Sequence, residues 1–236
     1  MDAYFNGTIP VTTSITLSDD FYGNSSQLGL SLTIASDITP PTLAPVVSPN
    51  PVYLNGSATA TANATDSGSG IASQSCGPVL TNTIGTKSVI CTATDNAGNT
   101  ATATVSYKVI YRFDGFLQPI NDTGHIQTCG TPCVVSIFKG GSTIPVKFQL
   151  KDANGNIVQA TSLPLWIAPL KGNATSAPVD ESIYTLPATS GSNYRWEGSS
   201  TYIYNWSTKG FASGYYWRIG VTLADGQTYY VIVGLR

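Results

Sequence analysis

The side chains that could do chemistry are few, and a single histidine, His125, limits the catalytic options. A Ser-His-Asp or Cys-His mechanism would need this residue as its base. It lies in "NDTGHIQTC", which is typical of a loop, and no nucleophile motif of the form GxSxG occurs. Asp180 and Glu181 are adjacent, so in a strand they would point to opposite faces and could not flank a substrate. We therefore predict that the chain is not an enzyme.

The four cysteines form two close pairs, Cys76 with Cys91 and Cys129 with Cys133. A metal site is the alternative, but no Cys-x-x-Cys occurs and only one histidine is available. Two disulfides formed in an oxidising compartment are the better interpretation. The first would contribute about 3 kcal/mol in the chain-entropy model. The second would close the short turn "CGTPC" and gain less.

Calcium is the one metal that the acidic residues favour. Asp37, Asp66, Asp95 with its neighbour Asn96, and Asp114 all fall at expected strand ends or domain edges. Carboxylates at such junctions can bind calcium and stiffen tandem domains. The alternative is that they are ordinary turn residues, and no twelve-residue calcium loop is present. No other cofactor is expected.

Aromatic residues crowd the C-terminal half, and Tyr202, Tyr204 and Trp206 share one face of an expected strand. If exposed, they would stack against sugar rings. If buried, they are part of a sandwich core, which is the usual place for alternating aromatics and the interpretation we favour. Burial would also block the glycosylation sequon at Asn205.

Asn-x-Ser/Thr sequons indicate an exported protein. About three would arise by chance in a chain so rich in Ser and Thr, so the excess is suggestive. Besides Asn205, the candidate glycosylation sites are Asn6, Asn24, Asn55, Asn63, Asn121 and Asn173.

The elements that must position these residues are expected to be strands. Charged residues make up 10% of the chain, with Gly 23 and Pro 14 supplying turns, and no window has helical apolar spacing. Between Lys87 and Val109, apolar and small residues alternate with threonine and serine on both sides of "DNAGN". Asn154-Gly155 and Asp225-Gly226 are strong hairpin signals. The predicted fold class is all-β, with tandem immunoglobulin-like β-sandwiches.

Three segments follow from the pattern. Residues 1–37 hold two strand-like runs, which a lone hairpin could not stabilise in water. They are the end of a preceding domain, added strands on the next domain, or a donor strand for a neighbouring subunit. A proline-rich connection opens a second segment, 38–108, and the third segment is 109–236.

Both larger segments resemble known families. The run "DITPPTLAPVVSPNPVYLNGSATATANATDSGSGI" with "GTKSVICTATDNAGNTATATVSYKV" resembles hyalin-repeat and related bacterial immunoglobulin-like modules. The pieces "YRFDGFLQPIN", "FKGGSTIPVKFQLKDANGN", "YIYNWSTKGF" and "RIGVTLADGQTYYVIVGLR" resemble the PxKF module of microbial surface proteins, with "IPVKF" at Ile144 to Phe148. The resemblance implies β-sandwiches used as spacers or adhesion units, without chemistry of their own. The stretch 160–192 departs from the family pattern and is expected to be irregular.

The net charge and the absence of long apolar runs limit the classes of partner that we expect. With a net charge of −2 and no basic patch, nucleic acid is not expected, and no apolar run is long enough for membrane insertion. Met1-Asp2-Ala3 is not a signal peptide, so we infer a segment whose targeting parts are missing. We predict an extracellular or cell-surface structural module of a surface layer, stalk or filament. Its expected partners are neighbouring domains or identical subunits, through residues 1–37, and glycans. The alternative function is an adhesin or a carbohydrate-binding accessory module of a larger secreted enzyme.

Overall fold

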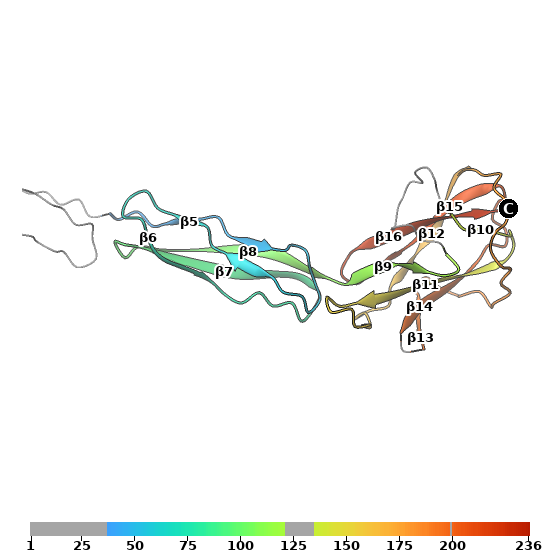
Figure 1. The fold of residues 1–236 in the computed structure, drawn as a ribbon, viewed down its shortest axis with the longest axis horizontal. Helices are drawn as coiled ribbons and strands as arrows, with labels where there is room; N and C mark the ends of the chain where they lie inside the picture. The colour runs from blue at the N-terminus through green and yellow to red at the C-terminus, as the bar shows by residue number, and fades with distance from the viewer. Residues whose placement is uncertain (1–36, 121–134, 199) are drawn as a thin grey trace, which may run out of the picture. The chain divides into compact units, whose positions relative to one another are not determined.

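The computed structural model describes residues 37–120, 135–198 and 200–236, and in these ranges the protein consists of strands and loops without helices (Figure 1). The all-β prediction is confirmed. The described residues accordingly include no helix with the length and apolarity that a membrane span requires. The strands are β1 Thr42–Leu43, β2 Val46–Ser48, β3 Val52–Tyr53, β4 Thr59–Thr61, β5 Ala64–Thr65, β6 Ile71–Cys76, β7 Gly85–Asp95, β8 Thr100–Ile110, β9 Arg112–Leu117, β10 Ile137–Phe138, β11 Thr143–Lys151, β12 Leu165–Ala174, β13 Arg195–Glu197, β14 Thr201–Ser207, β15 Tyr215–Thr222 and β16 Thr228–Leu235.

The chain divides into two compact units whose segments alternate along the sequence. Unit 1 contains the described residues up to Pro49, Thr59–Val79 and Ser88–Ser106. Unit 2 contains Asn50–Ala58, Leu80–Lys87 and the described residues of Tyr107–Arg236. The two strand-like runs expected before residue 37 lie outside the described residues.

Unit 1 is built around the alternating strands that the sequence indicates. In β7 the side chains of Val89, Cys91 and Ala93 are buried, whereas the residues between them face outward. Strand β7 lies between β6 and β8 in one sheet, and the short strands form the antiparallel pairs β1–β5 and β2–β4. Period-two alternation buries one face of a strand, so this small core forms without large side chains.

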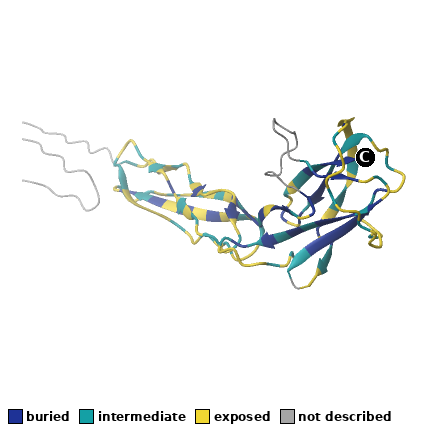
Figure 2. Ribbon diagram, turned by 45° about the vertical axis from the view of Figure 1, so that its right-hand side comes forward, coloured by how far each residue is buried: buried dark blue, intermediate teal, exposed yellow. Residues whose placement is uncertain are grey.

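Unit 2 contains two four-stranded sheets, in the orders β10-β16-β15-β12 and β13-β14-β11-β9. The core lies between them and is rich in aromatic rings, which Figure 2 marks as buried stretches on strands of both sheets. Phe148 is its centre, with Tyr202 stacked on it at 5.1 Å and Phe113 and Tyr194 at 5.4 and 4.9 Å. Rings at such distances add to the stability that their burial provides.

The predicted hairpin at Asp225-Gly226 is confirmed, because β15 and β16 pair along their whole length with Thr222 opposite Thr228. The prediction of a second strand after Asn154-Gly155 is wrong beyond a single bridge between Lys151 and Ile157. The region expected to be irregular holds a ten-residue strand, β12, which pairs with β15 and shifts register twice, between Ile167 and Leu170 and between Lys171 and Ala174.

Two turns are closed by the same set of hydrogen bonds between an aspartate and the asparagine four positions later, which we call the Asp–Asn clasp. The Asp95 N–H donates to the Asn99 carbonyl at 3.0 Å, and the backbone and side-chain N–H groups of Asn99 donate to the two carboxylate oxygens of Asp95 at 2.8 Å each. Asp152 and Asn156 repeat the arrangement at 3.0 and 3.1 Å. The glycine before each asparagine has φ of 92° or 84°, which glycine adopts at little cost.

Candidate functional site

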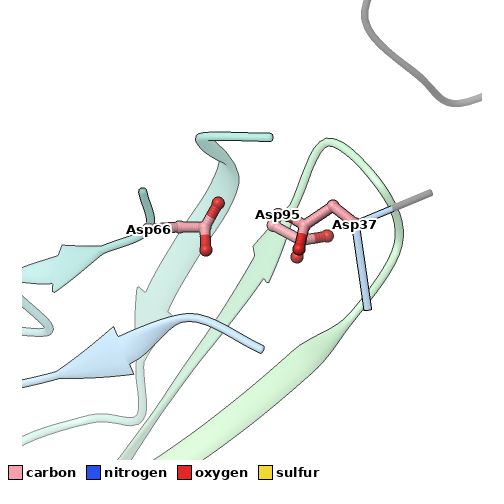
Figure 3. Close-up of side chains that lie close together, drawn as sticks. All are labelled: Asp37, Asp66 and Asp95. Carbon is pink, nitrogen blue, oxygen red and sulfur yellow. The ribbon is translucent and has the colours of Figure 1, made fainter. Parts of the chain in front are cut away.

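Three of the acidic residues predicted from the sequence meet at one end of unit 1. Asp95 ends β7, Asp66 follows β5, and Asp37 precedes β1. Each contributes one carboxylate oxygen, and these oxygens all lie within 4.8 Å of one another. Figure 3 shows the side chain of Asp66 directed toward those of Asp37 and Asp95. We call these residues the acidic triad.

Backbone donors hold each carboxylate of the triad in place. Asp37 accepts hydrogen bonds from the N–H groups of Thr39 at 2.9 Å and Ser69 at 2.8 Å. Asp66 accepts one from Gly70 at 2.7 Å. Asp95 is almost completely buried and is held by its clasp. Segment 66–70 therefore folds back on its own Asp66 through the Gly70 N–H and is bound by Asp37 through the Ser69 N–H.

The electrostatics keep Asp37 ionised. The hydrogen bond from the Thr39 backbone, followed by those from Ser69, lowers the pKa of the Asp37 carboxyl, and desolvation opposes this only in part. Donors that bind the charged form of an acid favour ionisation. Clustered carboxylate oxygens are the ligands that Ca²⁺ prefers, and it takes six to eight of them. The triad would supply three, so calcium binding here stays a prediction.

The other members of the predicted calcium set do not join the triad. The side-chain amide of Asn96 donates to the Ser69 carbonyl at 2.8 Å, so its nitrogen braces the loop. Asp114 belongs to unit 2 and forms ion pairs with Arg112 at 2.7 Å and Lys151 at 2.9 Å. Arg112 is two positions away on the same strand, so the sequence pattern could have shown this pairing, whereas Lys151 is 37 positions away.

The favoured interpretation of Tyr202, Tyr204 and Trp206 as core residues is confirmed, and the sugar-stacking alternative is wrong. All three side chains are buried in the core of unit 2, with exposed fractions of 0%, 8% and 3%. Their face of β14 points toward the opposite sheet, where Trp166 stacks on Tyr204 at 4.3 Å.

The sequons differ in how accessible their amides are. Asn205 is 4% exposed and its Nδ2 donates to the Pro187 carbonyl at 2.9 Å, so the expected block of this sequon is present. The amide of Asn55 donates to Asp152 at 3.2 Å and that of Asn63 to the Ala44 carbonyl at 3.1 Å. Asn173 is exposed on β12. The remaining sequons, Asn6, Asn24 and Asn121, lie outside the described residues.

Cys76 and Cys91 are opposite each other on β6 and β7 and are joined by a disulfide. Cys129, Cys133 and His125 lie outside the described residues.

Asp180 and Glu181 are not in a strand, contrary to the sequence argument. Both reach the same segment, because the Ile137 N–H donates to Asp180 at 2.6 Å and the Ser136 hydroxyl to Glu181 at 2.8 Å. A loop allows adjacent side chains to turn the same way, and sequence spacing alone could not show this.

No family model matches this chain, and no curated protein matches it. Among solved structures, it is similar to the crystal structure of domains 4 and 5 of the S-layer protein SbsC, with 14% identity over 84% of this chain and 99% of that one, at a TM-score of 0.23. It is also similar to the crystal structure of the S-layer protein rSbsC(31-844), with 14% identity and a TM-score of 0.25. That match covers 83% of this chain but 28% of the other.

Proposed function

We propose that this chain is a non-catalytic structural module of a microbial cell-surface protein, combining a hyalin-repeat-like and a PxKF-like module. The observation that carries the proposal is the use of its carboxylates. Six of the described aspartates accept backbone N–H groups and so brace loops and turns: Asp37, Asp66, Asp95, Asp152, Asp180 and Asp225. Carboxylates that accept backbone hydrogen bonds are held in their charged form and stabilise loops, a structural use that needs no proton transfer.

Asp225 illustrates this bracing over a long sequence distance. Its carboxylate accepts the Tyr111 N–H at 2.8 Å and the Gln227 N–H at 2.9 Å, so it connects the start of unit 2 to its last hairpin. The Cys76–Cys91 disulfide cross-links the small core of unit 1 covalently. Both features suit a module that must keep its shape outside the cell, where disulfides persist.

The test is made on the protein isolated from its native source. Alkylation followed by mass spectrometry should find Cys76 and Cys91 blocked, and immunogold labelling should place the protein on the cell surface. Free thiols together with an intracellular label would contradict the proposal. Light scattering on the full-length chain would then separate an assembling subunit, which forms defined oligomers, from a spacer, which stays monomeric.

Calcium at the acidic triad is the metal part of this proposal. Added calcium should slow hydrogen exchange in unit 1, because an ion would relieve the repulsion among three carboxylates. Asp66→Asn should abolish this effect, since it removes one charge and keeps an oxygen that accepts the Gly70 N–H. Asp114→Asn makes the same charge change in unit 2 and is the control. If calcium does not change hydrogen exchange in the parent protein, the calcium proposal is contradicted and the proposed structural role is unaffected.

A further inference from the structure

One sheet of unit 2 carries positive charge without negative charge. Strands β10, β12, β15 and β16 contain no aspartate or glutamate, but they include Lys171 and Arg218. The opposite sheet is mixed, with Arg195 paired to Glu197 and Asp114 paired to its two cations. Within its strands, this sheet of a chain of net charge −2 therefore carries only positive charge, and the carboxylates of Asp180 and Glu181 lie at its β10 edge.

The strand register decides which side chains face outward on this sheet. Trp217, Ile219 and Val221 of β15 are buried in the core, so the residues between them occupy the outer face. Their cross-strand partners on β16 and β12 lie on the same face. We call this the outer face of the β15 sheet; it contains Leu165, Ile167, Leu170, Tyr216, Arg218, Gly220, Thr222, Thr228, Tyr230, Ile232 and Gly234.

Two glycines of this face allow side chains of the neighbouring strands to lie low over the backbone. Gly220 is opposite Tyr230, whose Cδ1 lies 2.8 Å from where a Cβ of residue 220 would be. The side chain of Ile137 on β10 fills the space above Gly234, and Cε1 of Tyr216, which is opposite Gly234 on β15, lies 3.5 Å from the equivalent point. Both tyrosines are half-buried, while Leu170 beside them is 56% exposed.

The two cations of the sheet are held by rings and not by carboxylates. The guanidinium carbon of Arg218 lies 4.6 Å from the centre of the Tyr230 ring, and Nζ of Lys171 lies 3.4 Å from that of Tyr215. Neither cation forms an ion pair with any carboxylate in the described part of the chain. A ring orients the cation without neutralising it, so Arg218 keeps its charge and its fork of N–H donors for an external anion.

We propose that the outer face of the β15 sheet binds an acidic polysaccharide. The carboxylate of a uronic acid unit would pair with the Arg218 guanidinium, which the Tyr230 ring orients, and the flat face of a neighbouring pyranose ring would pack on Tyr216. A sheet face with rings, an unpaired cation and the Thr222 and Thr228 hydroxyls suits a sugar polymer. A protein partner would instead need a pocket for an anchoring side chain. This binding goes beyond the proposed structural role and does not depend on it.

The test is affinity gel electrophoresis of the full-length protein in gels that contain polygalacturonate, with dextran as the neutral control. The protein should be retarded by polygalacturonate and not by dextran, and added salt should weaken the effect because salt screens exposed charges. Arg218→Gln should weaken the interaction about tenfold, the magnitude of a lost charge-assisted hydrogen bond. Lys147→Gln makes the same charge change on the opposite sheet and should keep the affinity within about twofold.

The ring contribution has its own pair of variants. Tyr230→Phe keeps the ring and should bind like the parent protein, whereas Tyr230→Leu should lose affinity. The unfolding midpoint by tryptophan fluorescence shows whether each variant keeps its fold.

Four outcomes would overturn the proposal: no retardation by polygalacturonate at low ionic strength, equal retardation by dextran, equal loss in Arg218→Gln and Lys147→Gln, or a dimer of the parent protein that Arg218→Gln dissociates. The last would identify a second copy of the chain as the occupant.

Discussion

Replacing Gly220 by alanine should destabilise unit 2, because the middle of β15 has no room for a Cβ. The added carbon would overlap the Tyr229 carbonyl oxygen and lie 2.8 Å from Cδ1 of Tyr230 and 3.3 Å from Cδ1 of Ile167. The two side-chain atoms can rotate away, but the carbonyl belongs to a strand paired along its whole length with β15. Overpacking of this kind costs about 1–3 kcal/mol. The conformational gain from removing a glycine, about 0.5–1 kcal/mol, offsets only part of it.

Tryptophan fluorescence isolates the effect, since all four tryptophans, Trp166, Trp196, Trp206 and Trp217, belong to unit 2. Urea titration should show a lower midpoint for Gly220→Ala with an unchanged slope, which signifies a loss of stability and not a change in the surface exposed. The matched control is Gly172→Ala on the neighbouring edge strand β12. Its Cβ would have only the Tyr216 carbonyl oxygen at 3.3 Å as a close neighbour. We expect this control to change stability by less than about 0.5 kcal/mol.

Two results would refute the reasoning. If Gly220→Ala is as stable as the parent protein, the β15–β16 pair can separate at no cost and the packing argument fails. If Gly172→Ala loses as much stability as Gly220→Ala, the cost comes from alanine in these strands in general and not from the missing space.

Three further predictions follow from the cross-link, the buried phenol and the sequons. Replacing both Cys76 and Cys91 by alanine should lower the stability of unit 1 by about 3 kcal/mol, read from hydrogen exchange, and leave the tryptophan signal of unit 2 unchanged. Burial, with the nearby Asp225 carboxylate, raises the pKa of Tyr229 from 10.0 to about 12. Because the folded state favours the protonated phenol, the raised pKa contributes folding stability that is fully present below pH 10 and is lost as the pH rises through 12. The urea midpoint should therefore fall between these pH values, and a constant midpoint would contradict the prediction. If the native host glycosylates folded protein, peptide mass spectrometry should find glycan at exposed Asn173 and none at buried Asn205; a glycan at Asn205 would contradict the burial.

Local patterns in the sequence predict the parts of the fold that depend on local chemistry. The alternation in β7 depends only on which residues are apolar, and the structure buries Val89, Cys91 and Ala93 as expected. The hairpin at Asp225-Gly226 likewise depends on a turn that accepts positive φ. Features of this kind need no knowledge of what packs on the strand.

Features that depend on distant segments were not accessible from the sequence. The chain after Asn156 does not continue as a strand, because the Tyr202 and Tyr111 hydroxyls accept the N–H groups of Ala160 and Thr161 at 2.7 and 3.1 Å. No pattern near residue 160 indicates which tyrosine will reach it. Side-chain hydrogen bonds of this sort compete with sheet pairing, and only the packed structure shows the result.

The candidate sites divide in the same way. Sequence placed the three aspartates of the acidic triad at strand ends, but their convergence depends on how three separate segments meet. The outer face of the β15 sheet was missed, although its signal was present: four strands free of acidic residues, with glycines opposite tyrosines. Only the strand register shows that Arg218 shares a face with Tyr230.

The Asp–Asn clasps have a consequence for the order in which the chain folds. Each clasp joins residues four positions apart, whereas Asp225 and Tyr111 are separated by 114 positions. Closing a short loop costs little chain entropy, so each clasp can form before the contacts that bring distant strands together. A closed clasp already sets which residues of β7 and β8 face each other. The slow search for distant partners then begins from a hairpin whose register is settled, and this limits the number of mispaired states open to a chain rich in similar Thr/Ala strands.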